Sequence, residues 1–184
     1  MLSYLRPLAQ DERVDIVRVT DDSRFWSFLR GIRGNKVAIP QLQLEARQSD
    51  LLALDPGETT GVAVWHAEES IIYLFQLETG SIEKGFRLVE ELIDIVQPHH
   101  LRAEDYRVYG HMTEQHSFAH LHTAQFIGSI RTVAAQKGIP LSVCLAMHAK
   151  TTWTDDKLKM CNLYNKGMKH ARDAQRHLLR YICE

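Results

Sequence analysis

The stretch that most constrains the fold is residues 51–65, Leu-Leu-Ala-Leu-Asp-Pro-Gly-Glu-Thr-Thr-Gly-Val-Ala-Val-Trp. Its opening apolar run is typical of a short strand buried on both faces. Pro56 and Gly57 then predict a tight turn, because proline fixes φ and glycine permits positive φ. Residues 61–65 resume a strand-like pattern, so the stretch predicts a β-hairpin with Asp55 at the end of its first strand. Asp55 either only begins the turn or is a buried carboxylate that needs a partner, since desolvating an unpaired charge is costly.

Composition and charge exclude several classes of protein. The 184 residues, 45% of them hydrophobic, suit one domain or one domain with an appendage. A formal net charge of −1 excludes nucleic-acid binding through overall charge, so any basic surface must be local. The three cysteines, Cys144, Cys161 and Cys183, lack metal-ligand spacing and are typical of a reducing compartment. With no signal peptide or membrane-spanning run found, we expect a cytoplasmic protein with no membrane partner.

The remaining pattern predicts an α/β fold with the element order β-β-β-α-β-α-β-α over residues 51–184. After the hairpin, strands are expected at 71–77, 101–104 and 141–145, and helices at 82–96, 118–137, 155–164 and 168–182. Residues 1–50 form a separate α/β segment with a strand at 14–19. We interpret it as an appendage that packs on the main sheet, and a DNA-contacting arm is the alternative.

A second acidic site follows from the topology. A right-handed crossover after the third strand can place the fourth strand parallel to the first. Their carboxyl ends would then lie side by side, about 5 Å apart. By alternation, Glu104 rather than Asp105 would lie beside Asp55, and a divalent cation would relieve the repulsion between the two carboxylates. The alternative is that Glu104 and Asp105 are solvated loop acids.

The last predicted helix adds a histidine and a third acid. His170 and Asp173 are spaced i and i+3, on one helical face, and this residue combination suits Mg²⁺ or Mn²⁺. A surface pair is the alternative. Basic residues surround them: Lys150, Lys157, Lys159, Lys166, Lys169, Arg172, Arg176 and Arg180. They form either a solvated helix face or, beside a carboxylate cluster, a surface for a polyanionic substrate.

Together these motifs resemble the RuvC-like Holliday-junction resolvases of the ribonuclease-H-like superfamily, in particular their phage-borne branch. The matching residues are Leu-Asp-Pro-Gly-Glu-Thr-Thr-Gly-Val-Ala from residue 54, Glu-Asp-Tyr from 104 and His-Ala-Arg-Asp-Ala from 170. The resemblance covers about residues 51–184. It implies a mixed five-stranded sheet flanked by helices, carrying an N-terminal α/β appendage here. It also implies a crossover junction endodeoxyribonuclease, located in the host cytoplasm if phage-encoded.

The resemblance assigns the catalytic and metal-binding roles to Asp55, Glu104, His170 and Asp173. It implies two Mg²⁺ ions, replaceable by Mn²⁺, with Asp55 between them. One ion would lower the pKa of the attacking water, and the other would stabilise the leaving 3′ oxygen.

The expected DNA contacts lie near these acids and in the C-terminal third. Resolvases often carry an aromatic residue three positions after the strand-four Glu, whereas this chain has Arg107 there, between Tyr106 and Tyr109. These three residues are candidates for contacting unstacked bases, and basic residues for contacting phosphates. The predicted DNA-binding residues are Tyr106, Arg107, Tyr109, Lys150, Lys157, Lys166, Lys169 and Arg172.

A homodimer is expected because resolving a junction needs two symmetry-related nicks. Phe118, His122, Phe126 and Ser129 lie close to one stripe of the helix at 118–137 and form the predicted interface. The alternative is that they complete the monomer core. Three other functions remain open: a general flap or branched-DNA nuclease, a catalytically silent DNA-binding relative, and an actin-like nucleotide-binding protein.

Overall fold

The structure, a computed structural model, describes residues 15–18, 49–67, 71–106 and 119–183. Its centre is a mixed six-stranded sheet with the strand order β1-β4-β3-β2-β5-β6. The strands are β1 Asp15–Arg18, β2 Leu51–Asp55, β3 Thr59–His66, β4 Ile71–Glu78, β5 His100–Asp105 and β6 Leu141–Leu145. The helices are α3 Ile82–Val96, α4 Ala119–Gln136, α5 Ala146–Thr152, α6 Asp155–Met160 and α7 Lys169–Cys183. The predicted α/β fold class is confirmed.

The connections explain why two strands far apart in the sequence become neighbours. Strands β2, β3 and β4 form an antiparallel meander. The chain then crosses through α3 to β5, which pairs in parallel with β2, and through α4 to β6, which pairs in parallel with β5. In the β2–β5 register Leu54 is opposite Ala103, so the next residues along the two strands are Asp55 and Glu104.

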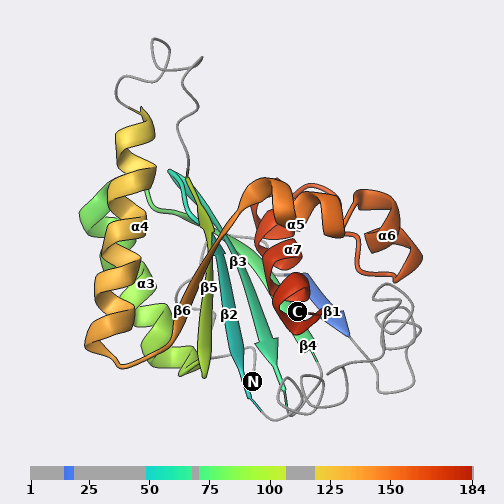
Figure 1. Cartoon of the computed structure of the whole chain (residues 1–184), viewed down its shortest axis with the longest axis horizontal. Helices are drawn as coiled ribbons and strands as arrows, with labels where there is room; N and C mark the ends of the chain where they lie inside the picture. The colour runs from blue at the N-terminus through green and yellow to red at the C-terminus, as the bar shows by residue number, and fades with distance from the viewer. Residues whose placement is uncertain (1–14, 19–48, 68–70, 107–118, 184) are drawn as a thin grey trace.

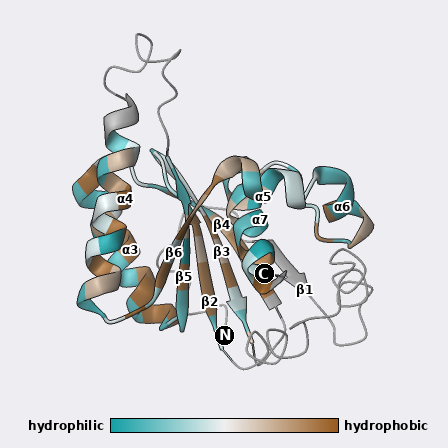
Figure 2. Cartoon of the chain, viewed as in Figure 1, coloured by the Kyte–Doolittle hydropathy of each residue, from teal (hydrophilic) through white to brown (hydrophobic). Residues whose placement is uncertain are grey.

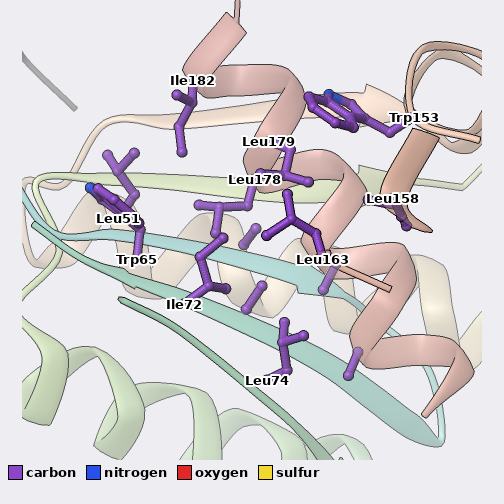
Figure 3. Packing of buried hydrophobic residues seen from close by; sticks show 14 of the residues in the cluster. Leu51, Trp65, Ile72, Leu74, Trp153, Leu158, Leu163, Leu178, Leu179 and Ile182 are labelled. Atoms are coloured by element: carbon purple, nitrogen blue, oxygen red, sulfur yellow. The ribbon is translucent and has the colours of Figure 1, made fainter. Parts of the chain in front are cut away.

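The two faces of the sheet are covered by different helices. Helices α3 and α4 lie on one face, and α5, α6 and α7 lie on the other (Figure 1). Alternate β2 residues separate accordingly: Leu52 and Leu54 belong to the core under α3 and α4, and Leu51 and Ala53 to the core under α7. Figure 3 shows the second core, where Leu178 and Leu179 of α7 meet the sheet. Asp55 follows Leu51 and Ala53 in this alternation, so it lies on the face of the sheet that α7 covers.

Apolar residues dominate the centre of the sheet, as Figure 2 shows for β2 and β3. Every residue of β2 is buried, which accounts for the unbroken apolar run in its sequence. The predicted hairpin after it is present, and the Thr60 hydroxyl closes its turn by donating to the Gly57 carbonyl oxygen at 3.1 Å. In the described part of the chain no helix is both long and apolar enough to cross a membrane.

The N-terminal segment contributes the sixth strand. Strand β1 pairs with the edge strand β4 in antiparallel register, with Asp15 opposite Leu74 and Arg18 opposite Ile71. The rest of residues 1–48 lies outside the described residues. The division into an appendage at 1–50 and a nuclease domain at 51–184 therefore stays a prediction.

Helix ends differ from the sequence prediction in the C-terminal third. The helix expected over 155–164 ends at Met160, because Asn162 adopts the left-handed region at φ 56°. Helix α5, which directly follows β6, was not predicted. It has only 7 residues, too few for its apolar periodicity to stand out from the preceding strand.

Phe126 lies in the core of the chain. Its ring is completely buried, and it packs so closely on α3 that a Cβ added at Gly85 would lie 2.7 Å from Cε2 of Phe126. His122 and Ser129 are half-buried, and Phe118 lies outside the described residues. The prediction that Phe126 forms part of a dimer interface is wrong, because α3 already covers this face of α4.

Candidate active site

Asp55 and Glu104 lie at the carboxyl ends of two adjacent parallel strands, β2 and β5. Asp55 is only 8% exposed, and Glu104 is half-buried. Burial raises the pKa of Asp55, a hydrogen bond with His170 opposes this, and the charges of Glu104 and Asp173 raise the pKa further. Asp55 therefore lies within the field of both other acids, as one carboxylate of a cluster.

Gly61 of β3 brings the start of α7 against the sheet. A Cβ at this position would overlap the backbone of His170, so only glycine allows the approach. The His170 amide donates to the side-chain oxygen of Gln76 on β4 at 3.1 Å, which fixes the first turn. His170 is thereby held with Nδ1 2.9 Å from Asp55 Oδ2. This hydrogen bond outweighs the effect of burial and raises the pKa of His170.

Asp173 enters the cluster from the next turn of α7 and is 3% exposed. Arg176 donates to its Oδ1 through Nη1, and Nζ of Lys150 lies 3.1 Å from its Oδ2. Burial alone would lower the pKa of Lys150, but the negative charges of Glu104, Asp173 and Asp55 raise it overall. The Lys150 ammonium therefore pairs with Asp173 and lies within the field of Glu104 and Asp55.

Glu104 has a partner on α7 as well. Its Oε2 lies 2.9 Å from Nε2 of His177, a residue that is completely buried. Each of the three acids is thus paired with a base of the protein: Asp55 with His170, Glu104 with His177, and Asp173 with Arg176 and Lys150.

The four predicted ligands share one site in this arrangement but do not form a metal cage. Among the residues that the structure describes, no group of three His, Cys, Asp or Glu side chains is positioned to hold a metal ion. The chemistry of the donors nevertheless fits a hard divalent cation, since three carboxylates and an imidazole converge. Burial is the main cause of the raised pKa of Asp55, and the charges of Glu104 and Asp173 add to it, while the same acids raise the pKa of Lys150; a cation would balance this negative charge.

The predicted DNA-binding residues separate into two groups. Lys166 and Lys169 are exposed beside the start of α7, and Tyr106 is half-buried at the end of β5. Arg107 and Tyr109 lie outside the described residues.

The other predicted DNA contacts have partners inside the protein. Nζ of Lys157 donates to the Thr152 carbonyl oxygen at 2.7 Å, while Lys150 lies in the acid cluster. Arg172 donates to the Asn165 carbonyl oxygen at 2.8 Å, and its guanidinium lies 5.0 Å from the ring centroid of Tyr164. Arg172 therefore helps to hold the segment before α7.

Sequence reasoning missed four residues that build the site. Gly61 and Gln76 position the start of α7; Gly61 belongs to the hairpin motif, which does not predict this role, and no motif contains Gln76. Arg176 was noted only as one of many basic residues, and His177 was not noted at all. Their spacing offered a signal, because His177 follows Asp173 by four residues and His170 by seven, which places all three on one face of α7.

Comparison with known proteins identifies the fold. No protein-family model and no curated protein matches the sequence. Among solved structures, Thermus thermophilus RuvC in complex with a Holliday junction substrate matches with a TM-score of 0.55 and 15% identity, over 71% of this chain and 90% of RuvC. The chain has the RuvC fold.

A second RuvC structure agrees with this fold at low sequence identity. A second Thermus thermophilus RuvC structure gives a TM-score of 0.52 and 17% identity over 71% of this chain and 91% of RuvC. The yeast mitochondrial Holliday junction resolvase Ydc2 gives a TM-score of 0.47 and 12% identity, over 85% of this chain and 93% of Ydc2. The fold implied by the sequence motifs is confirmed, while the assignment to a phage-borne branch stays a prediction.

Proposed function

We propose that the chain is a metal-dependent endonuclease that cleaves branched DNA, and that it resolves four-way Holliday junctions. The observation that carries this proposal is the convergence of three acids and His170, from β2, β5 and α7, within a RuvC fold. RuvC itself has been solved with a Holliday junction substrate, which supports the substrate class.

The metal site of this proposal consists of Asp55, Glu104, Asp173 and His170, and Mg²⁺ is the resident ion, with Mn²⁺ able to replace it. Two ions held by these residues would lower the pKa of the attacking water and stabilise the leaving 3′ oxygen. The protein supplies the ligands on rigid elements, two at strand ends and two on the first turns of α7. To bind metal, His170 must give up its hydrogen bond to Asp55, and Asp173 must give up its ion pair with Lys150.

Lys150 has a second role once Asp173 binds metal. Its ammonium pairs with Asp173 within the field of the other two acids, and its side chain is 44% exposed, so it can reach a phosphate brought to the site from solvent. Lys166 and Lys169 extend this positive surface and contact phosphates without reading bases. The DNA affinity should therefore fall with rising salt.

The homodimer belongs to the proposal because a junction needs two symmetry-related cuts. Phe126 is part of the monomer core and therefore does not belong to the interface of this dimer. Sedimentation at about twice the monomer mass, with near-simultaneous nicks on opposing strands, is the expected result. A monomer that cuts one strand at a time would contradict it.

The experiment compares labelled four-way junction, flap, fork and linear duplex with Mg²⁺ or Mn²⁺, for wild type and Asp55→Asn. We expect selective junction cleavage by wild type and a loss of orders of magnitude in Asp55→Asn, which keeps its phosphate contacts and therefore its DNA affinity. Equal cutting of flaps and junctions would point instead to a general branched-DNA nuclease. Binding without cleavage would point to a silent DNA-binding relative, and nucleotide binding alone to an actin-like protein.

A further inference from the structure

His177 connects α7 to the acid on β5. It lies in the middle of α7, is completely buried, and places Nε2 2.9 Å from Glu104 Oε2. A carboxylate can only accept a hydrogen bond, so Nε2 carries the hydrogen and donates it. The contact spans 73 positions in the sequence and joins the helix that carries His170 and Asp173 to the strand that carries Glu104.

The surroundings of His177 do not explain it as a core residue. Its buried neighbours on α7 include the apolar Ala174, Leu178 and Leu179, and Asp173 and Arg176 bond each other rather than His177. The other ring nitrogen, Nδ1, is buried and has no hydrogen-bond partner among the described residues. A buried polar atom without a partner costs free energy, so an aliphatic side chain would serve packing better. Within the described part of the chain, the one polar contact of the imidazole is that with Glu104.

We propose that His177 is a positioning residue that orients the Glu104 carboxylate for metal binding. This inference rests on the proposed function. Donation to Oε2 fixes the rotation of the carboxylate, and no described group bonds Oε1, which leaves that oxygen for the cation. Partners that orient a ligand typically change metal affinity or activity about 10–100-fold when they are removed.

The chain therefore holds its acids in two different ways. Asp173 is bonded at both oxygens, by Arg176 and Lys150, and must release one of them to bind metal. Among the described residues, Glu104 has a hydrogen bond at one oxygen only, so it can bind a cation without giving up His177. His177 consequently contributes in the metal-bound state, where its loss is measurable as weaker metal binding.

Two amide substitutions test the inference as a matched pair. In His177→Gln the amide nitrogen reaches roughly the position of Nε2 and keeps the donor to Glu104. In His177→Asn the side chain is one methylene shorter, so its amide nitrogen cannot reach Glu104. We expect His177→Asn to bind Mn²⁺ about 10–100-fold more weakly than wild type, and His177→Gln to keep an Mn²⁺ affinity within about threefold of wild type. Isothermal titration of the whole chain with Mn²⁺ measures this without any DNA.

The cleavage assay adds a readout that a purely structural role would not change. Raising the Mn²⁺ concentration should restore junction cleavage by His177→Asn, because the defect lies in metal affinity. In a Glu104→Gln background, His177→Asn should cause no further loss of Mn²⁺ affinity, because the two side chains act as one unit. If His177→Asn does not fold, His177→Met takes its place in these assays, because methionine fills the space without a hydrogen-bond donor.

The outcomes separate the two proposals. If wild type binds Mn²⁺ and folded His177→Asn or His177→Met binds it equally well, the role of His177 is refuted and the proposed function stands. If His177→Gln lost as much Mn²⁺ affinity as His177→Asn, the role of His177 would also be refuted. If wild type binds no Mn²⁺ while Asp55→Asn behaves identically, the proposed function fails and this inference fails with it.

Discussion

Gly61 tests how closely α7 must approach the sheet. A Cβ at this position would overlap the carbonyl group of His170 and lie 2.7 Å from the Ala171 nitrogen. These are backbone atoms, so a side-chain rotation cannot relieve the overlap. To restore an ordinary contact of about 3.5 Å with the nitrogen alone, the first turn of α7 must move about 0.8 Å, and the carbonyl demands more.

That displacement is large compared with the geometry of the site. The His170 Nδ1 to Asp55 Oδ2 distance is 2.9 Å and the His170 amide to Gln76 distance is 3.1 Å. Moving α7 outward by about 1 Å takes both beyond hydrogen-bond range. We expect Gly61→Ala to lower the free energy of unfolding by about 1–3 kcal/mol, as overpacking does, and junction cleavage by about 10²-fold.

Gly128 provides the matched control, since a Cβ there meets nothing within 4 Å. Gly128→Ala lies inside α4 and should stabilise the protein by about 0.5–1 kcal/mol with unchanged cleavage. Urea denaturation and single-turnover cleavage of a labelled junction measure both effects. Full activity of folded Gly61→Ala would refute the reasoning that contact of α7 with β3 sets the position of His170.

Other predictions concern His170 and the core. His170→Asp should retain substantial junction cleavage and His170→Ala should lose more, because a carboxylate can still bind metal; equal, wild-type rates in both would show that His170 takes no part in cleavage. The hydrogen bond with Asp55 raises the pKa of His170 above its ordinary value of 6.5. Protonated His170 should therefore stabilise the metal-free fold fully below pH 6.5, and this stabilisation should be lost as the pH rises through the raised pKa. Urea denaturation of wild type and His170→Ala across this range measures it, and a constant difference would contradict it. Phe126→Ala should cost about 3–5 kcal/mol in unfolding free energy by the same assay, and a neutral result would refute its place in the core.

The sequence was sufficient to place the strands that carry the acids. A strand buried on both faces must be apolar throughout, which made Leu51–Leu54 recognisable and set Asp55 at its end. The crossover through α3 after the three-stranded meander then allows β5 to lie parallel to β2, which brings Glu104 next to Asp55. Both inferences rest on local pattern and chain topology, which a single sequence contains.

The partners of the acids depend on distances between elements, which the sequence does not contain. The approach of α7 to β3 is set by the absence of a side chain at Gly61, and one glycine among ten gives no sign of this. His177 looks like one polar residue in an amphipathic helix until the helix is docked and its ring meets Glu104. Lys150 was read as a DNA contact, and its place among the carboxylates depends on α5, whose short helix has no periodic signal.

Cleavage of a labelled four-way junction by wild type and Asp55→Asn, in Mg²⁺ and in Mn²⁺, tests the central claim most directly. Asp55→Asn keeps the size of the side chain and removes the charge that Glu104, Asp173 and His170 surround. We predict paired nicks on opposing strands by wild type, and a rate lower by orders of magnitude for Asp55→Asn at similar junction affinity. Cleavage by Asp55→Asn at a rate near wild type, or an uncut junction with wild type in both metals, would contradict the assignment of this acid cluster as a nuclease site.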